Sequence, residues 1–486
     1  MKVFRRKSIH ALQVEASTDT SLTRALGAMN LTTLGIGAII GTGIFVLTGQ
    51  VAAKNAGPAV ILSFVLAGVA SIFAALCYAE FASVVPMAGS AYTYGYATLG
   101  ELVAWIIGWD LILEYALGAV SVAIGWSGYV VSFLRDVGIN VPCSYSAARG
   151  TLVTCPDGSS ILATFNLPAV LVIAAVTILL IVGIKESAMV NDVIVLVKVA
   201  VLLLFVIGAA HAVHLSNWTP FIPTATPGVR GAFGWGGVTT GAGVVFFAYI
   251  GFDAVSTAAQ EAKHPQRDVP IGIIASLLIC TVFYIVVSGI TTGVVSYTKL
   301  DVPDPIAVAA DAAGLGWMSS LIKLGAIMGL SSVILVMLLG QSRIFYAMAR
   351  DGLMPAFVNK VHPRFHTPYI TSIVTGVIVA FFAAILPISD AASLVSIGTL
   401  LAFVIVSIGV MVLRYREPNL RRTFRAPAVY VVGSLGVLTA SYLMYRLSFR
   451  TWERLVLWFL LGIVVYAAFG YRNSRLNTPN GRERLG

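Results

Sequence analysis

Gly41-Thr42-Gly43 interrupts an otherwise apolar stretch that runs from Leu31 to Ala53. Further along the chain, the apolar stretch Phe246-Phe247-Ala248-Tyr249-Ile250 is interrupted in the same way at Gly251. A helix that breaks inside a membrane exposes N–H and C=O groups that lipid cannot satisfy, so a break is tolerated only against protein or a polar cavity. Two breaks at corresponding positions in two halves of one chain are typical of the binding site of a secondary transporter.

The composition is that of an integral membrane protein. The chain is 58% hydrophobic and 11% charged, with a mean hydropathy of +0.91, whereas soluble domains carry about 25% charged residues. A helical span needs about 20 apolar residues. On that criterion we predict twelve spans, at 30–55, 58–85, 97–133, 164–184, 190–212, 238–262, 270–296, 317–349, 368–387, 392–414, 427–449 and 454–471.

The net charge of +10 is explained by topology. Lys and Arg are concentrated in the segments that lie on the same side as Met1–Asn30, which by the positive-inside rule places both termini in the cytoplasm. No nucleic-acid partner is therefore needed to explain the excess of basic residues. One hairpin does not fit, because Arg446, Arg450 and Arg454 fall on the predicted outer side.

The four cysteines divide into two pairs. Cys77 and Cys280 lie inside apolar spans and are most simply small packing residues. Cys143 and Cys155 share a polar loop on the predicted outer side, where compartment chemistry permits a disulfide, and we leave that bridge open. No spacing of Cys, His or acidic residues indicates a metal site, so we expect no metal and no other cofactor.

A short repeat supports an inverted architecture. Thr32-Thr33-x-Gly35-x-Gly37 precedes the first break, and Thr239-Thr240-Gly241-x-Gly243 precedes the second. Because five spans separate them, the second copy enters from the opposite side, as in 5+5 inverted repeats. We predict an all-α integral membrane domain of twelve transmembrane helices with discontinuous helices 1 and 6. The predicted ranges are 1–472 for the domain, 25–212 and 235–415 for the repeats, 427–471 for two extra C-terminal helices, and 473–486 for a cytoplasmic tail.

Several motifs resemble those of a known superfamily. They include Gly41-Thr-Gly-Ile-Phe-Val-Leu-Thr-Gly49, Cys77-Tyr-Ala-Glu-Phe81, Phe247-Ala-Tyr-Ile-Gly-Phe-Asp253 and His264-Pro-Gln-Arg-Asp-Val-Pro-Ile-Gly272. From about residue 25 to about 425, the chain resembles the amino acid–polyamine–organocation (APC) superfamily, and within it a bacterial member of the cationic amino acid transporter family. The resemblance implies a LeuT-like fold of ten helices in an inverted repeat, followed by two additional helices.

The first break suits a zwitterion. The preceding half-helix ends in carbonyls with partial negative charge, and the following one begins with N–H groups of partial positive charge. Glycines let a ligand approach the backbone, although they also serve simple helix packing. The resemblance assigns the carboxylate to the amides around Thr42 and Gly43, with the Thr42 hydroxyl. It assigns the ammonium to the carbonyls of Ile39, Phe247 and Ile250. The predicted substrate-binding residues are Ile39, Ile40, Gly41, Thr42, Gly43, Phe247, Ala248, Ile250 and Glu114.

Two of these residues have alternative roles. Phe247 would act as a lid over the substrate, or it is a core or lipid-facing aromatic. Glu114 lies near the middle of the third span, with Asp110 one turn earlier on the same face. It would line a pocket for a cationic side chain, or it pairs structurally with Lys198.

Lys198 lies inside the fifth predicted span, where an ionisable residue marks a functional site by default, although its stem could also snorkel toward the surface. In some members of the superfamily a lysine of this helix occupies the position at which relatives bind sodium, between helices one and eight. The resemblance implies Gly37, Ser331 and Ser332 as its neighbours and a proton, without sodium, as the coupling ion. Asp253 would join the coupling or would cap the half-helix that follows it.

The sequence therefore predicts proton-coupled uptake of L-amino acids, cationic or small and neutral such as alanine, across the plasma membrane of a bacterial-type cell. Alternatives are an amino acid or polyamine exchanger and an amino acid sensor without net transport. An enzyme is not expected, because no nucleophile–base motif occurs. The expected partners are the amino acid and the lipid bilayer.

Overall fold

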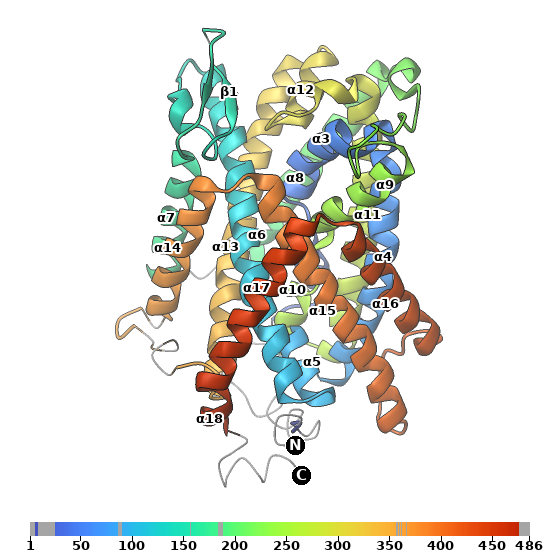
Figure 1. Ribbon diagram of the computed structural model, residues 1–486, viewed down its shortest axis with the longest axis vertical. Coiled ribbons are helices and arrows are strands. Elements are labelled where there is room, and N and C mark those ends of the chain that lie inside the picture. Colours follow the sequence, from blue (N-terminus) through green and yellow to red (C-terminus); the bar gives the residue numbers. More distant parts are fainter. Residues whose placement is uncertain are drawn as a thin grey trace.

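The computed structural model describes residues 5–7, 25–85, 90–155, 157–182, 188–355, 358, 360, 362–365 and 367–475. Most of the predicted C-terminal tail lies outside these ranges. The described chain is an elongated bundle of helices (Figure 1). Its regular helices are α4 (Val60–Val84), α5 (Ser90–Thr98), α6 (Glu101–Asp136), α7 (Leu167–Val182), α8 (Ala188–Ala209), α11 (Pro265–Val294), α13 (Gly316–Arg350), α14 (Tyr369–Ile385), α15 (Ile388–Arg416), α16 (Val429–Arg446) and α17 (Phe449–Val465).

Eight helical segments among the described residues are long and apolar enough to cross a membrane. Three shorter apolar helices are Ala28–Ile39, Leu167–Val182 and Tyr369–Ile385. The chain is therefore a helical membrane protein. The count of twelve spans stays a prediction.

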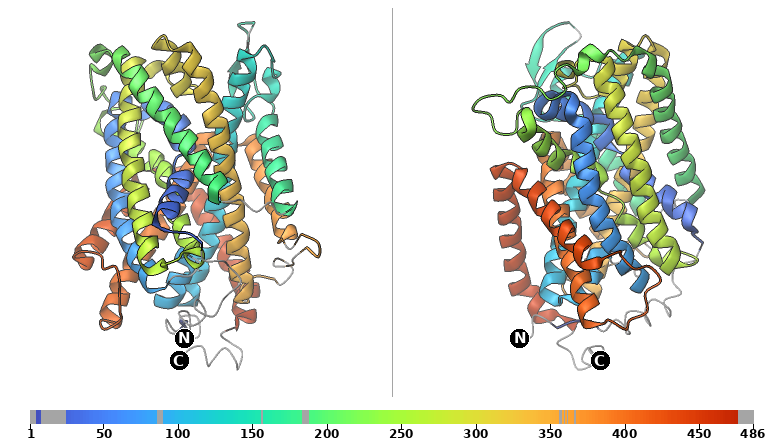
Figure 2. Two further views of the ribbon diagram at one scale, coloured as in Figure 1. Left: turned by 180° about the vertical axis from the view of Figure 1, so that it is seen from behind. Right: turned by 90° about the vertical axis from the view of Figure 1, so that its right-hand side faces the viewer.

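The first predicted span is interrupted at the glycine motif. α2 (Ala28–Ile39) ends at Ile40, whose backbone is extended. The chain resumes as π-helical and α-helical turns, namely η2 (Gly43–Leu47), α3 (Thr48–Val51), η3 (Ala52–Ala56) and the 3-10 turn η4 (Gly57–Ala59). Seen from behind, α8 crosses diagonally in front of this interrupted helix, which lies inside the bundle (Figure 2).

The second interruption follows α9 (Gly234–Val245). A 3-10 turn, η8 (Phe246–Tyr249), leads to Gly251, and the helix resumes briefly as α10 (Ala254–Thr257) before η9 (Ala259–Glu261). Gly251 has a φ of 121°, and a Cβ there would lie 2.9 Å from the backbone of Ala38. Only glycine combines that conformation with so close an approach, so the second break is fixed by this residue.

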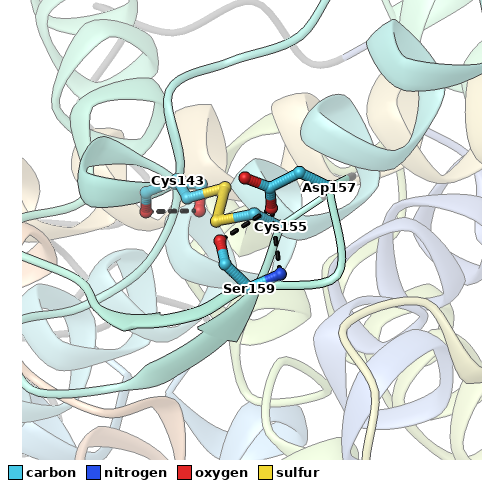
Figure 3. Close-up of a disulfide and its surroundings, with 5 residues drawn as sticks. Cys143, Cys155, Asp157 and Ser159 are labelled. Atoms are coloured by element: carbon cyan, nitrogen blue, oxygen red, sulfur yellow. Dashed lines mark hydrogen bonds between the residues drawn. A yellow bond between two sulfur atoms is a disulfide. The ribbon is translucent and has the colours of Figure 1, made fainter.

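One end of the bundle carries structure that the sequence did not predict. The loop after α6 forms the turn η5 (Cys143–Tyr145) and a hairpin of β1 (Leu152–Thr154) with β2 (Ser160–Leu162), paired in antiparallel register. A disulfide joins Cys143 to Cys155 beside this hairpin (Figure 3). Hydrogen bonds from Ser159 lower the pKa of the exposed Asp157 carboxyl in the same loop.

A short helix, α12 (Pro305–Ala312), covers the same end. Three short turns precede it along the chain: η6 (Ala210–Ala212) and η7 (Leu215–Trp218) follow α8, and η10 (Tyr297–Lys299) follows α11. The Lys323 ammonium lies 2.6 Å from Asp136 and 4.0 Å from Asp304, the residue before α12. Burial raises the pKa of Asp304, against the opposing effects of a hydrogen bond from Ser132 and the charge of Lys323. These contacts attach α12 to α6 and α13.

Both described ends of the chain meet at the opposite end of the bundle. Lys7 forms an ion pair with Asp351, and the Arg475 amide donates to the Asp351 carbonyl. Nearby, Glu101 accepts from Tyr466 in η12 (Tyr466–Gly470) and from Ser474, which follows α18 (Tyr471–Asn473). Residues 5–7 and the described residues up to Arg475 therefore lie at the same end of the bundle.

Glu80 is the centre of a buried ionic cluster at this end. Its carboxylate is fully buried and accepts from Arg414 at 2.6 and 3.0 Å and from the Ala426 amide at 2.8 Å. Arg422 adds a contact at 3.1 Å. Burial lowers the pKa of Arg422, although the charge of Glu80 counteracts that effect. The cluster ties α4 and α15 to the loop that precedes α16.

We predict that Glu80→Gln destabilises the folded protein by about 3–5 kcal/mol, because it leaves two arginines next to a neutral group in a buried place. Thermal unfolding of the full chain in detergent measures this effect. Glu417→Gln is the matched control, because the side chain of Glu417 is exposed in the same region. Equal stability of the two variants would contradict the assignment.

Candidate substrate and coupling site

The two interrupted helices touch each other at their breaks. A Cβ added to Gly43 would lie 2.2 Å from the Cβ and 2.4 Å from the Cα of Ala248. Such distances are shorter than any real carbon–carbon contact, so glycine is required if the two segments are to approach this closely. Gly43 therefore serves packing as well as the ligand access that the sequence indicated.

Tyr284 of α11 joins the same two segments by hydrogen bonding. Its buried hydroxyl lies 2.7 Å from the Ile39 carbonyl oxygen and 2.6 Å from the Ala248 carbonyl oxygen. A phenol has one proton to donate, so one donor is shared between a carbonyl of each break. The carbonyl of Ile39, which the resemblance assigned to the substrate ammonium, thus already has one partner.

The first break leaves several donors unused. None of the N–H groups of Gly41, Thr42 and Gly43 donates a hydrogen bond to a described residue. The hydroxyl of Thr42 is buried and likewise has no partner within the described chain. Buried polar groups are normally paired, and these lie at the N-terminal, electropositive end of a helical segment. They are arranged as an anion site.

The second break contributes acceptors. The Phe247 carbonyl accepts only a long bond, 3.2 Å, from the Ile250 amide, and the Ala248 carbonyl accepts from Tyr284. The Ile250 carbonyl has no hydrogen-bond donor among the described residues. The side chain of Phe247 is buried, which excludes the lipid-facing alternative. Its action as a lid stays a prediction.

Lys198 caps the end of α2. Its fully buried ammonium donates to the Gly37 carbonyl at 2.8 Å and to the Ile40 carbonyl at 3.2 Å. These carbonyls lie at the C-terminal end of a helix, where a cation is favourable. The aliphatic stem passes Gly329 of α13, where a Cβ would lie within 2.8 Å of it. Lys198 thus lies between α2 and α13 and does not snorkel.

The other residues expected near Lys198 make different contacts. Ser331 accepts from the Trp126 indole and donates to the Ile327 carbonyl, and Ser332 donates to the Gly329 carbonyl. Asp253 is buried at the N-cap position of α10, but its side chain makes no capping hydrogen bond to that helix. The coupling role of these residues stays a prediction.

Glu114 belongs to a group of buried acids. It lies near Thr399 of α15, with Asp110 and Asp253 as its charged neighbours. One carboxylate oxygen of Glu114 and both of Asp110 have no hydrogen-bond partner among the described residues. Asp110 lies against Gly398, where a Cβ would meet its carboxylate at 2.7 Å. Glu114 and Asp110 are placed on the face of α6 that packs on α15, whereas Asp253 precedes α10.

The comparison with known proteins shows the family of the chain. A family model described as amino acid permease matches residues 26–469. The chain belongs to the amino acid permease family. This permease is 48% identical to the branched-chain amino acid permease BcaP of Bacillus subtilis (strain 168), over 98% of this chain and 99% of that protein.

The names of two further relatives refer to substrates other than branched-chain amino acids. The methylthioribose transporter of the same organism is 45% identical, over 98% of this chain and 99% of that protein. The vacuolar cationic amino acid transporter 4 of Arabidopsis thaliana is 39% identical, over 85% of this chain and 67% of that protein. The resemblance to the APC superfamily is thereby confirmed. The names of the relatives do not agree on one substrate.

The sequence did not single out Tyr284. The signal available was a residue with a polar tip inside an apolar span, since a buried tyrosine hydroxyl usually finds a partner. Its two acceptors are 245 and 36 residues away along the chain. No local pattern of the sequence indicates such a contact.

We predict that Gly43→Ala separates the two breaks and abolishes substrate binding, with a lower thermal stability of the permease. Gly289→Ala in α11 is the matched control, because its Cβ would lie 3.5 Å from Ile61, an ordinary contact. Thermal unfolding and binding of a labelled amino acid are measured for both variants in detergent. Normal binding by Gly43→Ala would contradict the packing role of this glycine.

Proposed function

We propose that this permease is a secondary active transporter that binds the zwitterion of an amino acid between its two breaks. The observation that supports the proposal is the set of unpaired N–H groups at Gly41, Thr42 and Gly43. They would bind the carboxylate, together with the Thr42 hydroxyl. The free carbonyl of Ile250 and the weakly bonded one of Phe247 would accept from the ammonium.

The architecture that goes with this proposal has twelve spans. The first ten form two inverted repeats of five, with the breaks in helices 1 and 6, and α16 and α17 are the two additional helices. Contacts between Gly43 and Ala248, and between Gly251 and Ala38, support the pairing of the two interrupted helices. The location would be the plasma membrane of a bacterial-type cell with both termini in the cytoplasm.

For the side chain of the substrate, we propose a neutral aliphatic amino acid first and a cationic one second. The residues after the first break, Ile44, Phe45 and Val46, are apolar and buried, and BcaP, a branched-chain permease by name, supports the first choice. The unpaired carboxylate oxygen of Glu114 supports the second.

Competition for uptake decides between these substrates. In proteoliposomes, labelled leucine is the tracer, and unlabelled valine, alanine, arginine, lysine and methylthioribose are the competitors. We expect valine to inhibit most strongly and methylthioribose not to inhibit. Uptake that is inhibited by arginine and lysine alone would favour the cationic class. A lack of leucine uptake together with uptake of labelled methylthioribose would contradict an amino acid substrate.

The proposed coupling ion is a proton carried by Lys198, without sodium. A neutral amine still donates hydrogen bonds, but only the charged form adds attraction to the carbonyls of Gly37 and Ile40. Protonation would therefore favour the arrangement in which Lys198 holds α8 against α2, with α13 packed on the lysine stem. A proton shifts a conformational equilibrium only by its different affinity for the two states, and this contact provides such a difference.

We predict that Lys198→Arg loses uptake driven by a pH gradient but keeps counterflow, the exchange of internal for external substrate. Guanidinium stays charged at any workable pH, so the variant can cap α2 but cannot release a proton. Uptake and counterflow into proteoliposomes are measured without sodium for the wild type and for Lys198→Arg.

The possible outcomes distinguish the alternatives. Full proton-driven uptake by Lys198→Arg, or a strict sodium requirement of the wild type, would overturn the coupling role. Loss of both uptake and counterflow, with a lower unfolding temperature, would assign Lys198 a structural role only. A wild type that needs internal substrate is an exchanger, and one that binds without flux is a sensor.

A further inference from the structure

A cavity lies between the C-terminal helices, away from the two breaks. It has a volume of about 430 Å³ and is bounded by α15, α16 and α17. α17 contributes Trp452, Leu455, Val456, Phe459, Leu460 and Ile463. Leu401 and Val404 of α15 and Ser441 and Met444 of α16 complete the lining, so Ser441 is its one polar side chain.

The cavity opens toward the membrane. Val456, Leu460 and Ile463 are 50%, 54% and 49% exposed, and α16 and α17 stand at the edge of the bundle (Figures 1 and 2). The opposite face of α17 is closed, since Trp109 of α6 and Trp458 stack at 4.7 Å and exchange hydrogen bonds through indole and carbonyl. Hydrocarbon therefore has access from one side only.

The cavity matches one leaflet in length. Trp452 to Ile463 span roughly 16 Å of helix, and half of a hydrocarbon core is roughly 15 Å. An α-helix with its side chains is about 10 Å wide, too wide to enter a cavity enclosed by three helices of one chain. A single acyl chain is narrow enough to enter.

A cluster of arginines lies at the upper end of the cavity, in the hairpin between α16 and α17. Arg446 donates to the Gly236 carbonyl, and Arg454 forms an ion pair with Asp390. Arg450, in the first turn of α17, is exposed, and its guanidinium makes no ion pair or hydrogen bond with any described residue. Two acidic residues belong to the same region: Asp390, which already forms an ion pair with Arg454, and Glu453, which is exposed.

The same hairpin carries the features of a membrane interface. Tyr442, Tyr445 and Phe449 are 50%, 63% and 80% exposed, and exposed aromatic residues mark the headgroup level of a bilayer. Arginine on the outer side is unusual for a membrane protein, which calls for a compensating anion. The N-terminus of α17, capped by Ser448, adds its positive dipole at the same place.

We propose that this cavity binds one anionic phospholipid, with an acyl chain between α15, α16 and α17 and the phosphate at Arg450 and the N-terminus of α17. The lipid would fill the cavity and neutralise the hairpin. Its site is separate from the proposed amino acid site, because none of the lining residues belongs to the two breaks.

Native mass spectrometry of the full chain in detergent tests this site, with phosphatidylglycerol and phosphatidylcholine of identical acyl chains as probes. We expect the wild type to retain one phosphatidylglycerol in preference to phosphatidylcholine. Arg450→Ala should weaken phosphatidylglycerol binding about fivefold. Arg149→Ala, which removes an exposed arginine in the loop of the disulfide, is the matched control and should not weaken it.

A second variant tests the cavity itself. Ser441→Phe places a large side chain in the cavity and should remove retention of either lipid at this site, with an unchanged unfolding temperature measured without added lipid. Equal retention of both lipids by the wild type would overturn the proposal, as would unchanged binding by Arg450→Ala or Ser441→Phe. A dimer that is disrupted by Ser441→Phe would also overturn it, by showing that a second copy of the chain occupies this face.

Discussion

Backbone groups that a break exposes inside a membrane must find partners, and the permease meets this constraint with side chains from distant helices. The Lys198 ammonium donates hydrogen bonds to the carbonyls of Gly37 and Ile40 at the end of α2. The Tyr284 hydroxyl shares its hydrogen bond between the carbonyls of Ile39 and Ala248, one from each break. Without these donors, each unpaired carbonyl would cost several kcal/mol in a hydrocarbon environment.

The groups that remain unpaired define the proposed site. Within the described part of the chain, carbonyls at the first break are mostly hydrogen-bonded, whereas the N–H groups of Gly41, Thr42 and Gly43 are not. The asymmetry means that the first break attracts an anion and the second break offers acceptors. On the proposal made above, a zwitterion would satisfy both sets of groups at once.

Much of this could be predicted from the sequence because it depends on backbone chemistry. Gly41 and Gly43 locate the first break, Gly251 the second, and an apolar span around Lys198 identifies a buried cation. These signals are local. The membrane class and the family followed equally from composition and motifs, and the comparisons confirmed them.

The parts that were missed depend on contacts between segments far apart in the chain. The role of Gly43 in packing on Ala248 requires knowing that the two breaks touch, and the pairing of Tyr284 requires the same. The hairpin of β1 and β2 and the helix α12 are short elements in polar loops, where a few tertiary contacts decide the structure. Sequence periodicity contains little information about such elements.

The central claim is that backbone groups of the two breaks bind the carboxylate and the ammonium of one amino acid. Its most direct test is the affinity of the purified permease for leucine and for two analogues with the same side chain, 3-methylbutylamine, which lacks the carboxylate, and 4-methylpentanoate, which lacks the ammonium. The account predicts that each analogue binds at least roughly a hundredfold more weakly than leucine, because each leaves one set of buried groups unpaired. Binding of either analogue with the affinity of leucine would contradict it.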